Sequence, residues 1–293
     1  MAPEVEVEDR RLQLSNLDKV LYPQVGFAKG QVIDYYTRVA PVVLAHLRGR
    51  ALTLKRYPNG VEGHHFYEKQ KPSHAPDWVR SVAIEAGGRT IDFVLCDDLP
   101  TLVCLANLAD LELHPSLALA KDPDRPTLIA FDLDPGPPAG LAECRRVALL
   151  LRDTLAQLGL ECFPKTSGSK GMQVYVPLNT PVSYADTKPF AHALAQLLER
   201  QHGELVVSSM KKSLRGGKVF IDWSQNDRHK TTVAAYSLRA RERPTVSTPL
   251  AWDEVEDDDS ELIFEAHELL ERVAERGDLF EPVLELKQRL PKL

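Results

Sequence analysis

The sequence predicts an α+β fold in which mixed β-sheets are flanked by helices. The main observation is the order of periodic segments after about residue 125, which alternate as strand, helix, strand, loop, strand, helix and strand. The preceding half contains several short alternating segments bounded by turn residues, which indicate strands. The length of 293 residues leaves room for one large domain or two modest ones.

The elements of the N-terminal half follow in order along the chain. A short strand and a turn are expected at 12–23, and an amphipathic helix that contains Pro41 is expected at 29–47. Strands separated by the turn sequences PNG and GG are expected at 51–58, 64–70, 78–86 and 89–96. A helix at 99–111 leads into the short segment ELHP.

The elements of the second half alternate between the two types. Strands are expected at 127–134, 161–166, 171–178 and 216–223. Helices are expected at 141–159, 183–203 and 261–276, and the first two of these end at a glycine. The sequence SGSKG joins the two central strands, so this region is expected to be a strand–loop–strand unit.

Charge is distributed unevenly along the chain. The net charge of −6, taken as a total, argues against a nucleic-acid partner. However, 252–293 contains 14 Asp and Glu against 5 Lys and Arg, whereas 205–243 contains nine Lys and Arg against three Asp and Glu. The sequence therefore predicts a basic surface together with an acidic C-terminal segment.

No segment predicts a membrane or a secretory route. No apolar run approaches the roughly 20 residues that cross a bilayer. The acidic N-terminus lacks the apolar stretch of a signal peptide. The four cysteines, which have no CxxC spacing, are expected to be reduced core thiols in a cytoplasm.

The stretch TLIAFDLDPGPP places two acids at the end of an apolar strand. Asp132 and Asp134 are expected to point the same way, because alternate side chains of a strand share a face. Such a pair repels unless a cation lies between the carboxylates or one of them is protonated. Asp222, in the apolar strand VFIDW, could join them if the two strands pair. Three oxygen donors suit two Mg²⁺ or Mn²⁺ ions; alternatively, the acids and PGPP only end a strand in a turn.

The SGSKG loop joins the strands expected at 161–166 and 171–178. Glycines allow backbone N–H groups to converge on an anion, while Ser167 and Lys170 can add a hydroxyl donor and a positive charge. The Walker A pattern is absent. The loop therefore predicts either a phosphate cradle or an ordinary Gly/Ser hairpin turn with a solvated lysine.

In combination, these motifs resemble the polymerase domain of bacterial ligase D, in the archaeo-eukaryotic primase superfamily, which serves non-homologous end joining. The resemblance rests on FDLDPG, KTSGSKGMQVYVPL, VFIDW and VAAYSLRA in that order, between residues 16 and 250. It implies one primase-polymerase domain over 1–293 with an RRM-like catalytic part. The β-rich part would extend to about residue 125, the catalytic part over 126–251 and an acidic helical segment over 252–293.

The resemblance also implies roles for individual residues. The metal-binding catalytic carboxylates would be Asp132, Asp134 and Asp222. The nucleotide would be bound by His114, Ser167, Lys170, Gln173 and Arg239. A pocket for a 5′-phosphate would contain Asn16, Lys19 and Lys29, and the template would contact Phe66, Tyr67 and Arg215. By chemistry alone, lysines such as Lys19 and Lys29 are more often surface charges, and a histidine such as His114 is more often structural. Of two adjacent aromatics in a strand, such as Phe66 and Tyr67, one usually faces the core.

One position departs from the family pattern. Many members have KGxH in the second motif, whereas Gln173 occupies the histidine position here. Glutamine can donate a hydrogen bond to phosphate but carries no positive charge. Weaker or differently tuned triphosphate binding is therefore expected.

The function that follows from the resemblance is template-dependent nucleotidyl transfer with two Mn²⁺ or Mg²⁺ ions and an NTP or dNTP, ribonucleotides being favoured. The partners would be gapped or broken DNA with 5′-phosphate ends, with Ku and a DNA ligase as candidates, near the bacterial nucleoid and without a membrane. One alternative is a primase-polymerase for replication restart or lesion bypass. Another is a non-catalytic module that bridges DNA ends.

Overall fold

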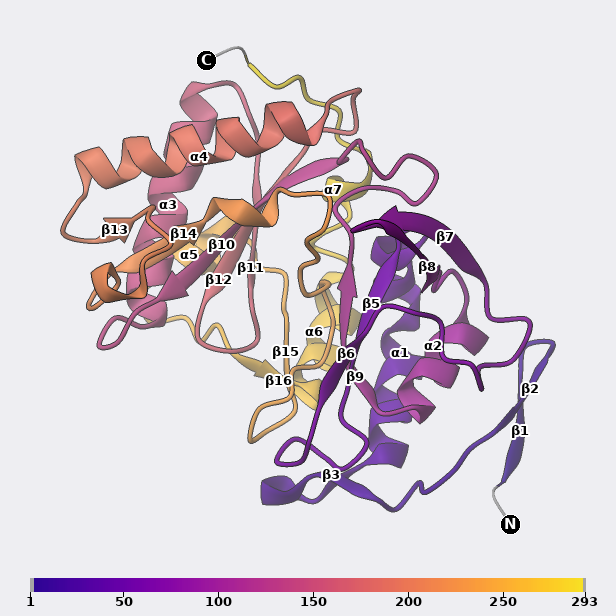
Figure 1. Ribbon diagram of the computed structural model, residues 1–293. Helices are drawn as coiled ribbons and strands as arrows, with labels where there is room; N and C mark the ends of the chain where they lie inside the picture. The colour runs from indigo at the N-terminus through magenta and orange to yellow at the C-terminus, as the bar shows by residue number, and fades with distance from the viewer. Residues whose placement is uncertain (1–2, 292–293) are drawn as a thin grey trace. The chain divides into compact units, whose positions relative to one another are not determined.

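The computed structural model describes residues 3–291, and the chain forms two compact units (Figure 1). The first unit comprises the residues up to Ser116 together with Thr231–Ser247 and Phe264–Gly277. The second unit comprises Leu117–Lys230, Thr248–Ile263 and the residues from Asp278 onward. Each unit is therefore assembled from segments that are distant in the sequence. Within residues 3–291, no helix has the length and apolar character needed to cross a bilayer.

Among the described residues, the first unit contains one main sheet, three α-helices and three two-stranded sheets. The main sheet consists of β5 (Leu52–Arg56), β6 (Phe66–Glu68), β7 (Ser81–Ala86), β8 (Arg89–Val94) and β9 (Asp110–Pro115). The helices are α1 (Lys29–Leu47), α2 (Leu99–Asn107) and α6 (Ala266–Arg276). The small sheets pair β1 (Glu4–Val7) with β2 (Arg10–Gln13), β3 (Val20–Tyr22) with β4 (Phe27–Ala28), and β15 (Thr245–Val246) with β16 (Phe264–Glu265).

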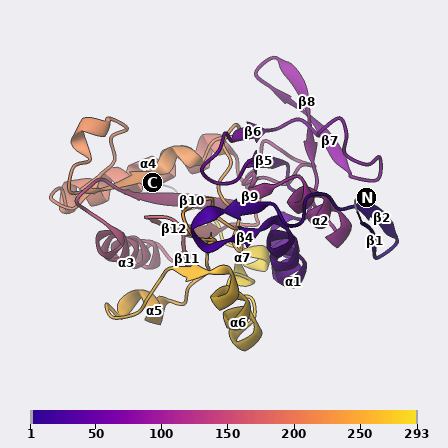
Figure 2. The same ribbon diagram turned by 90° about the horizontal axis from the view of Figure 1, so that it is seen from below.

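Strand β5 is central in the main sheet, because it pairs antiparallel with β6, β8 and β9. Its Lys55 lies directly opposite Tyr67 on β6 and directly opposite Glu112 on β9. Helices α1 and α2 lie side by side in both views (Figures 1 and 2). The hydroxyl of Tyr36 on α1 donates to the backbone oxygen of Leu111 on β9 at 2.8 Å, which ties this helix to the sheet.

The second unit is built on a five-stranded sheet in the order β11-β12-β10-β14-β13. The strands are β10 (Leu128–Pro135), β11 (Phe163–Thr166), β12 (Met172–Pro177), β13 (Val206–Val207) and β14 (Val219–Asp222). The helices are α3 (Leu141–Gln157), α4 (Tyr184–Gln201), α5 (Trp252–Glu256) and α7 (Pro282–Glu285). Helix α3 packs against β10 and β12, and its residues Val147 and Leu151 are fully buried.

Most of the expected elements are confirmed, and the differences have local causes. The helix expected at 99–111 ends at Asn107. Ala109 then adopts a left-handed backbone with φ of 57°, and β9 begins at Asp110, so ELHP belongs to a strand. The helix expected at 261–276 begins only at Ala266, because two residues before it pair with β15. The chain thus has mixed sheets flanked by helices, as the α+β prediction states.

Candidate functional site

Three carboxylates gather on the sheet of the second unit. Asp132 and Asp134 are two residues apart on β10 and therefore project from the same face. Asp222, the last residue of β14, is the direct cross-strand partner of Asp132 in the antiparallel ladder. Directly opposed residues share a face, with Cβ atoms about 5 Å apart. The strand register therefore brings together the three acids that the sequence analysis identifies.

A row of polar residues extends from these carboxylates across the neighbouring strands. Gln173 on β12 lies opposite Asp132, and Lys165 on β11 lies opposite Gln173. The Gln173 amide donates to Asp132 Oδ1 at 3.0 Å, and its carbonyl oxygen accepts from the Tyr175 hydroxyl at 3.1 Å. The ammonium of the fully buried Lys165 lies 5.5 Å from the centre of the Tyr175 ring. The row thus adds a buried cation that the sequence analysis did not identify.

Burial and repulsion between the acids both act on the carboxyl group of Asp132. Burial and then the negative charge of Asp134 raise the pKa of Asp132 from 3.8 to about 6, and Asp222 acts in the same direction. The hydrogen bond from Gln173 and the charge of Lys165 oppose this rise in the pKa, because both favour the ionised form. The protein therefore holds a carboxylate that would be stabilised by an additional positive charge.

The carboxylate of Asp222 is held by its neighbours in the chain. Its Oδ1 accepts from the backbone N–H and the hydroxyl of Ser224 at 2.9 and 2.6 Å, and its Oδ2 accepts from the Gln225 amide at 2.8 Å. Within the described residues, no three His, Cys, Asp or Glu side chains form a ready-made set of metal ligands. The donor chemistry nevertheless fits a hard divalent cation, because three carboxylates share one face and Asp132 has a raised pKa. The three hydrogen bonds from Ser224 and Gln225 leave part of the acceptor capacity of Asp222 for a cation.

The SGSKG loop forms a tight hairpin turn next to β10. The Ser167 hydroxyl accepts from the backbone N–H groups of Ser169 and Gly171, each at 3.3 Å. A Cβ at Gly171 would lie 2.2 Å from the backbone oxygen of Leu133, so the loop approaches β10 too closely for any other residue. The Lys170 ammonium donates to the backbone oxygen of Pro135 at 3.5 Å. The loop therefore places its lysine at the end of the strand that carries Asp132 and Asp134.

Arg215 lies at the same end of the sheet. Its guanidinium carbon lies 3.7 Å from the centre of the Phe220 ring, and Phe220 is the cross-strand partner of Asp134. One terminal nitrogen donates to the backbone oxygen of Met210 at 2.9 Å. Its Nε is buried and has no hydrogen-bond partner among the described residues. This residue, expected at the template, is thus close to the carboxylates.

His114 and Arg239 meet in the first unit around a carboxylate that the sequence analysis missed. Glu112 Oε2 accepts from His114 Nε2 at 3.0 Å and pairs with Arg239 Nε at 3.5 Å. Lys55 Nζ lies 3.3 Å from both carboxylate oxygens. Burial lowers the pKa of His114, and Glu112 only partly offsets this effect. Two residues expected at the nucleotide are therefore joined by one buried acid.

The two adjacent aromatics of β6 differ in exposure. Tyr67 is 59% exposed, whereas Phe66 is half-buried and lies under the Arg56 guanidinium at 5.4 Å. The Tyr67 ring meets the His114 ring edge-to-face at 5.8 Å. An exposed tyrosine beside the histidine provides a surface on which a base could stack.

Asn16, Lys19 and Lys29 also lie close together in the first unit. The Lys19 backbone N–H donates to the Asn16 oxygen at 3.0 Å, and the Lys29 N–H donates to the Lys19 oxygen at 2.9 Å. The Lys29 ammonium donates to the Ser15 hydroxyl at 3.1 Å. Burial and then the charge of Lys19 lower the pKa of Lys29 from 10.5 to about 8. Two cations held this close are suited to an anion.

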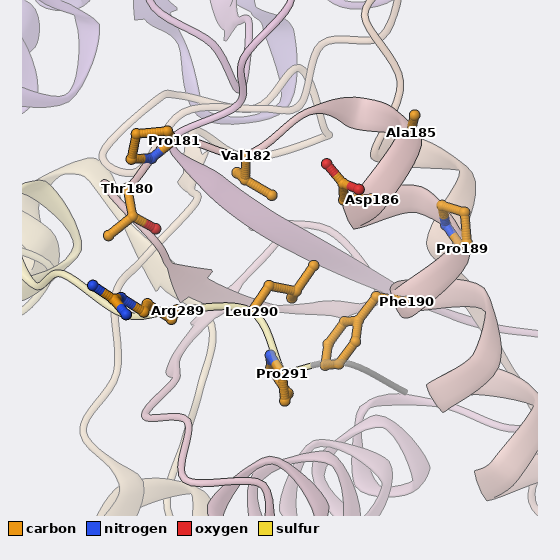
Figure 3. Close-up of a pocket in the computed structure, with 10 residues that line it drawn as sticks. All are labelled: Thr180, Pro181, Val182, Ala185, Asp186, Pro189, Phe190, Arg289, Leu290 and Pro291. Atoms are coloured by element: carbon orange, nitrogen blue, oxygen red, sulfur yellow. The ribbon is translucent and has the colours of Figure 1, made fainter.

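A pocket of about 780 Å³ lies elsewhere in the second unit. Figure 3 shows Pro181, Val182 and Phe190, from the start of α4 and the residues before it, near Leu290 and Pro291 of the C-terminal segment. None of the predicted site residues lines this pocket. It is therefore separate from the row of carboxylates.

Comparisons with known proteins show the family. The family model described as "LigD, primase-polymerase domain" matches residues 28–280. Multifunctional non-homologous end joining DNA repair protein LigD from Mycobacterium tuberculosis is 43% identical over an alignment of 281 residues, and the match covers 93% of this chain and 37% of that protein. Bifunctional LigD from Bacillus subtilis is 31% identical over 91% of this chain and 43% of its own length. The chain thus spans well under half of these relatives.

A solved structure matches over nearly its full length. The polymerase domain of Mycobacterium tuberculosis ligase D in complex with DNA has a TM-score of 0.89 and 42% sequence identity, with 94% of this chain and 98% of that chain covered. The chain therefore has the archaeo-eukaryotic primase fold, as expected from its motifs. It belongs to the LigD primase-polymerase domain family and is a homologue of the polymerase domains of end-joining proteins.

Proposed function

We propose that the chain is a template-dependent nucleotidyltransferase that fills gaps and extends ends at DNA breaks in non-homologous end joining. The observation that carries this proposal is the register of β10 and β14, which aligns Asp132 and Asp222 and sets Asp134 on the same face. Family membership supports it, because the matching relatives are end-joining proteins. Residues 1–293 would act as one primase-polymerase domain.

The proposed reaction is attack of the primer 3′-oxygen on the α-phosphorus of an NTP or dNTP, with departure of pyrophosphate. Asp132, Asp134 and Asp222 would hold Mn²⁺ or Mg²⁺, which would lower the pKa of the attacking hydroxyl and neutralise developing charge. Gln173 keeps the Asp132 carboxylate oriented through its 3.0 Å hydrogen bond. Lys170 and Ser167 would bind the β- and γ-phosphates, for which the loop supplies a lysine and backbone N–H groups.

The other predicted residues would bind the nucleotide and the DNA. His114 and Arg239 would contact the nucleotide. Tyr67 and Phe66 would stack on the template, for which the exposed Tyr67 ring is well suited, and Arg215 would contact the template as well. The 5′-phosphate pocket of Asn16, Lys19 and Lys29 would recognise the downstream end of a gap. We extend the proposal to a preference for ribonucleotides and to Ku and a DNA ligase as partners.

The test is primer extension on a gapped duplex, with Mn²⁺ compared with Mg²⁺, NTP with dNTP, and a downstream 5′-phosphate with a 5′-hydroxyl. Extension should occur with the wild-type chain and disappear in Asp132→Ala. The exposed Asp258 of the same unit gives a matched control, so Asp258→Ala should extend normally. Extension that persists in Asp132→Ala would contradict the assigned site.

Two further measurements, synthesis on an unprimed template and bridging of DNA ends, separate the alternatives. A primase-polymerase for replication restart or lesion bypass would make products on a template without a primer. A module that only bridges DNA ends would hold 5′-phosphorylated ends together equally well in wild-type protein and in Asp132→Ala, with no extension in either.

A further inference from the structure

One face of the main sheet of the first unit carries a continuous polar row. Tyr67, Lys55 and Glu112 are directly opposed across β6, β5 and β9. His114 follows Glu112 by two residues on β9 and so projects from the same face. The Lys55 ammonium lies 5.4 Å from the centre of the Tyr67 ring. The strand register therefore brings the four side chains together in one row.

Glu112 is the centre of this row. Only 2% of the residue is exposed, and both oxygens are fully engaged. Oε1 accepts from the backbone N–H of Ala240 at 3.1 Å, from Lys55 at 3.3 Å and from the Tyr57 hydroxyl at 3.4 Å. Oε2 accepts from His114 and Lys55 and pairs with Arg239. One carboxylate thus joins β5, β9 and the segment that carries Arg239.

Two basic side chains, Lys55 and Arg239, share the single carboxylate of Glu112. Burial by itself would raise the pKa of Glu112, but the hydrogen bond from His114 and the charges of Arg239 and Lys55 hold that pKa well below its usual range. Glu112 therefore remains ionised and can hold both basic side chains and His114 at the same time.

An ionised carboxylate also determines the tautomer of His114. A carboxylate can only accept hydrogen bonds, so the 3.0 Å contact requires that His114 Nε2 carries the proton. Burial lowers the pKa of His114, so the ring is neutral at pH 7.5 and Nδ1 carries a lone pair. His114 then offers an acceptor to a ligand, whereas Lys55 and Arg239 offer donors.

We propose that Glu112 is a positioning residue that orients Lys55, His114 and Arg239 together for binding of a nucleoside triphosphate. This inference rests on the proposed function and assigns that site a residue that the family motifs quoted above do not include. Removing the Glu112 charge has two opposing effects. If Glu112 only neutralised Lys55 and Arg239, loss of its charge would strengthen binding of the triphosphate. If Glu112 holds these side chains in place, loss of its charge weakens binding.

Two variants separate these effects. Glu112→Gln keeps the shape and removes the charge, whereas Glu112→Asp keeps the charge and shortens its reach. Binding of ATP and of inorganic tripolyphosphate, measured by calorimetry with Mn²⁺ present, should weaken at least tenfold in both variants. Glu68→Gln is the control, because Glu68 forms a comparable ion pair with Arg56 at 2.7 Å in the same sheet, and ATP affinity should stay within twofold. Unchanged or tighter binding in Glu112→Gln would overturn the proposal.

A second measurement does not require the variants to fold or the chain to be a polymerase. Nitrogen-15 NMR of the histidine rings in the wild-type chain at pH 7.5 should show His114 as the neutral Nε2–H tautomer. An Nδ1–H tautomer or a protonated ring would overturn the proposal. If wild-type protein binds no ATP, the proposed function fails, whereas the tautomer result still decides whether Glu112 orients His114.

Discussion

Asp132→Asn is expected to stabilise the fold while it removes the activity. Asparagine keeps an oxygen that can accept the 3.0 Å hydrogen bond from Gln173, but it carries no charge that burial would desolvate or that would repel Asp134 and Asp222. In the wild-type chain the pKa of Asp132 is raised from 3.8 to about 6. At about 1.4 kcal/mol for each tenfold change in proton affinity, ionising this carboxyl in the fold costs about 3 kcal/mol.

The sign of the pH dependence follows from the raised pKa. Below pH 3.8 Asp132 is protonated in both the folded and the unfolded chain, so the substitution has little effect on stability. Between pH 3.8 and about 6 the folded chain binds more protons, and the wild-type free energy of unfolding falls as the pH rises. Above pH 6 the deficit is constant, so the advantage of Asp132→Asn should reach at most about 3 kcal/mol.

The assay is urea denaturation of both proteins from pH 4 to pH 8 in EDTA. The quantity to compare is the difference between the two free energies of unfolding at each pH, because the contributions of all other titrating groups cancel in this difference. Asp258→Asn, an exposed change in the same unit, should stay within about 0.5 kcal/mol of wild type. Added Mn²⁺ should stabilise wild type more than Asp132→Asn at pH 8. An Asp132→Asn chain that is no more stable than wild type at pH 8 would refute the electrostatic argument.

Three further predictions concern other parts of the structure. Gln173→Leu removes a hydrogen-bond donor that lowers the pKa of Asp132. The pH at which half of the stabilisation by Mn²⁺ is reached should therefore rise by about half a unit or more. An unchanged midpoint would contradict the role of Gln173. Since Lys29 has a pKa lowered to about 8 and is charged below it, stimulation of extension by a 5′-phosphate should decline above about pH 8, and Lys29→Arg should abolish this decline. A Cβ at Gly136 would lie 2.0 Å from the Arg215 backbone oxygen, so Gly136→Ala should lose about 1–3 kcal/mol in urea denaturation. Gly216→Ala, where nothing lies within 4 Å of the added carbon, should change little.

The local parts of the site could be predicted from the sequence. The spacing of Asp132 and Asp134 places both carboxylates on one face of any strand, whatever the strand packs against. The SGSKG sequence similarly predicted a loop between two strands, and the structure has this loop between β11 and β12. Helix α1 begins and ends where its periodicity indicates. These features depend on backbone geometry over a few residues, which the sequence encodes directly.

Which residues lie next to the predicted site residues depends on the pairing of strands that are distant in the sequence. Lys165 and Glu112 are charged residues in short strands that also contain other polar residues, and nothing in their local sequence distinguishes them from solvent-facing positions. Lys165 joins the carboxylates only because β11, β12 and β10 align in register. Glu112 meets Arg239 across more than 120 residues of sequence.

The sequence by itself determined the class of fold and the family, and it predicted the chemical type of the site, because periodicity and short motifs are local properties. Only the tertiary structure decided that Asp222 lies opposite Asp132, that Asp222 is already engaged by Ser224 and Gln225, and that one buried glutamate connects His114 with Arg239. The physical reason is that cross-strand register is set by the packing of whole sheets. A shift of one residue in either sheet would turn these side chains to the opposite face.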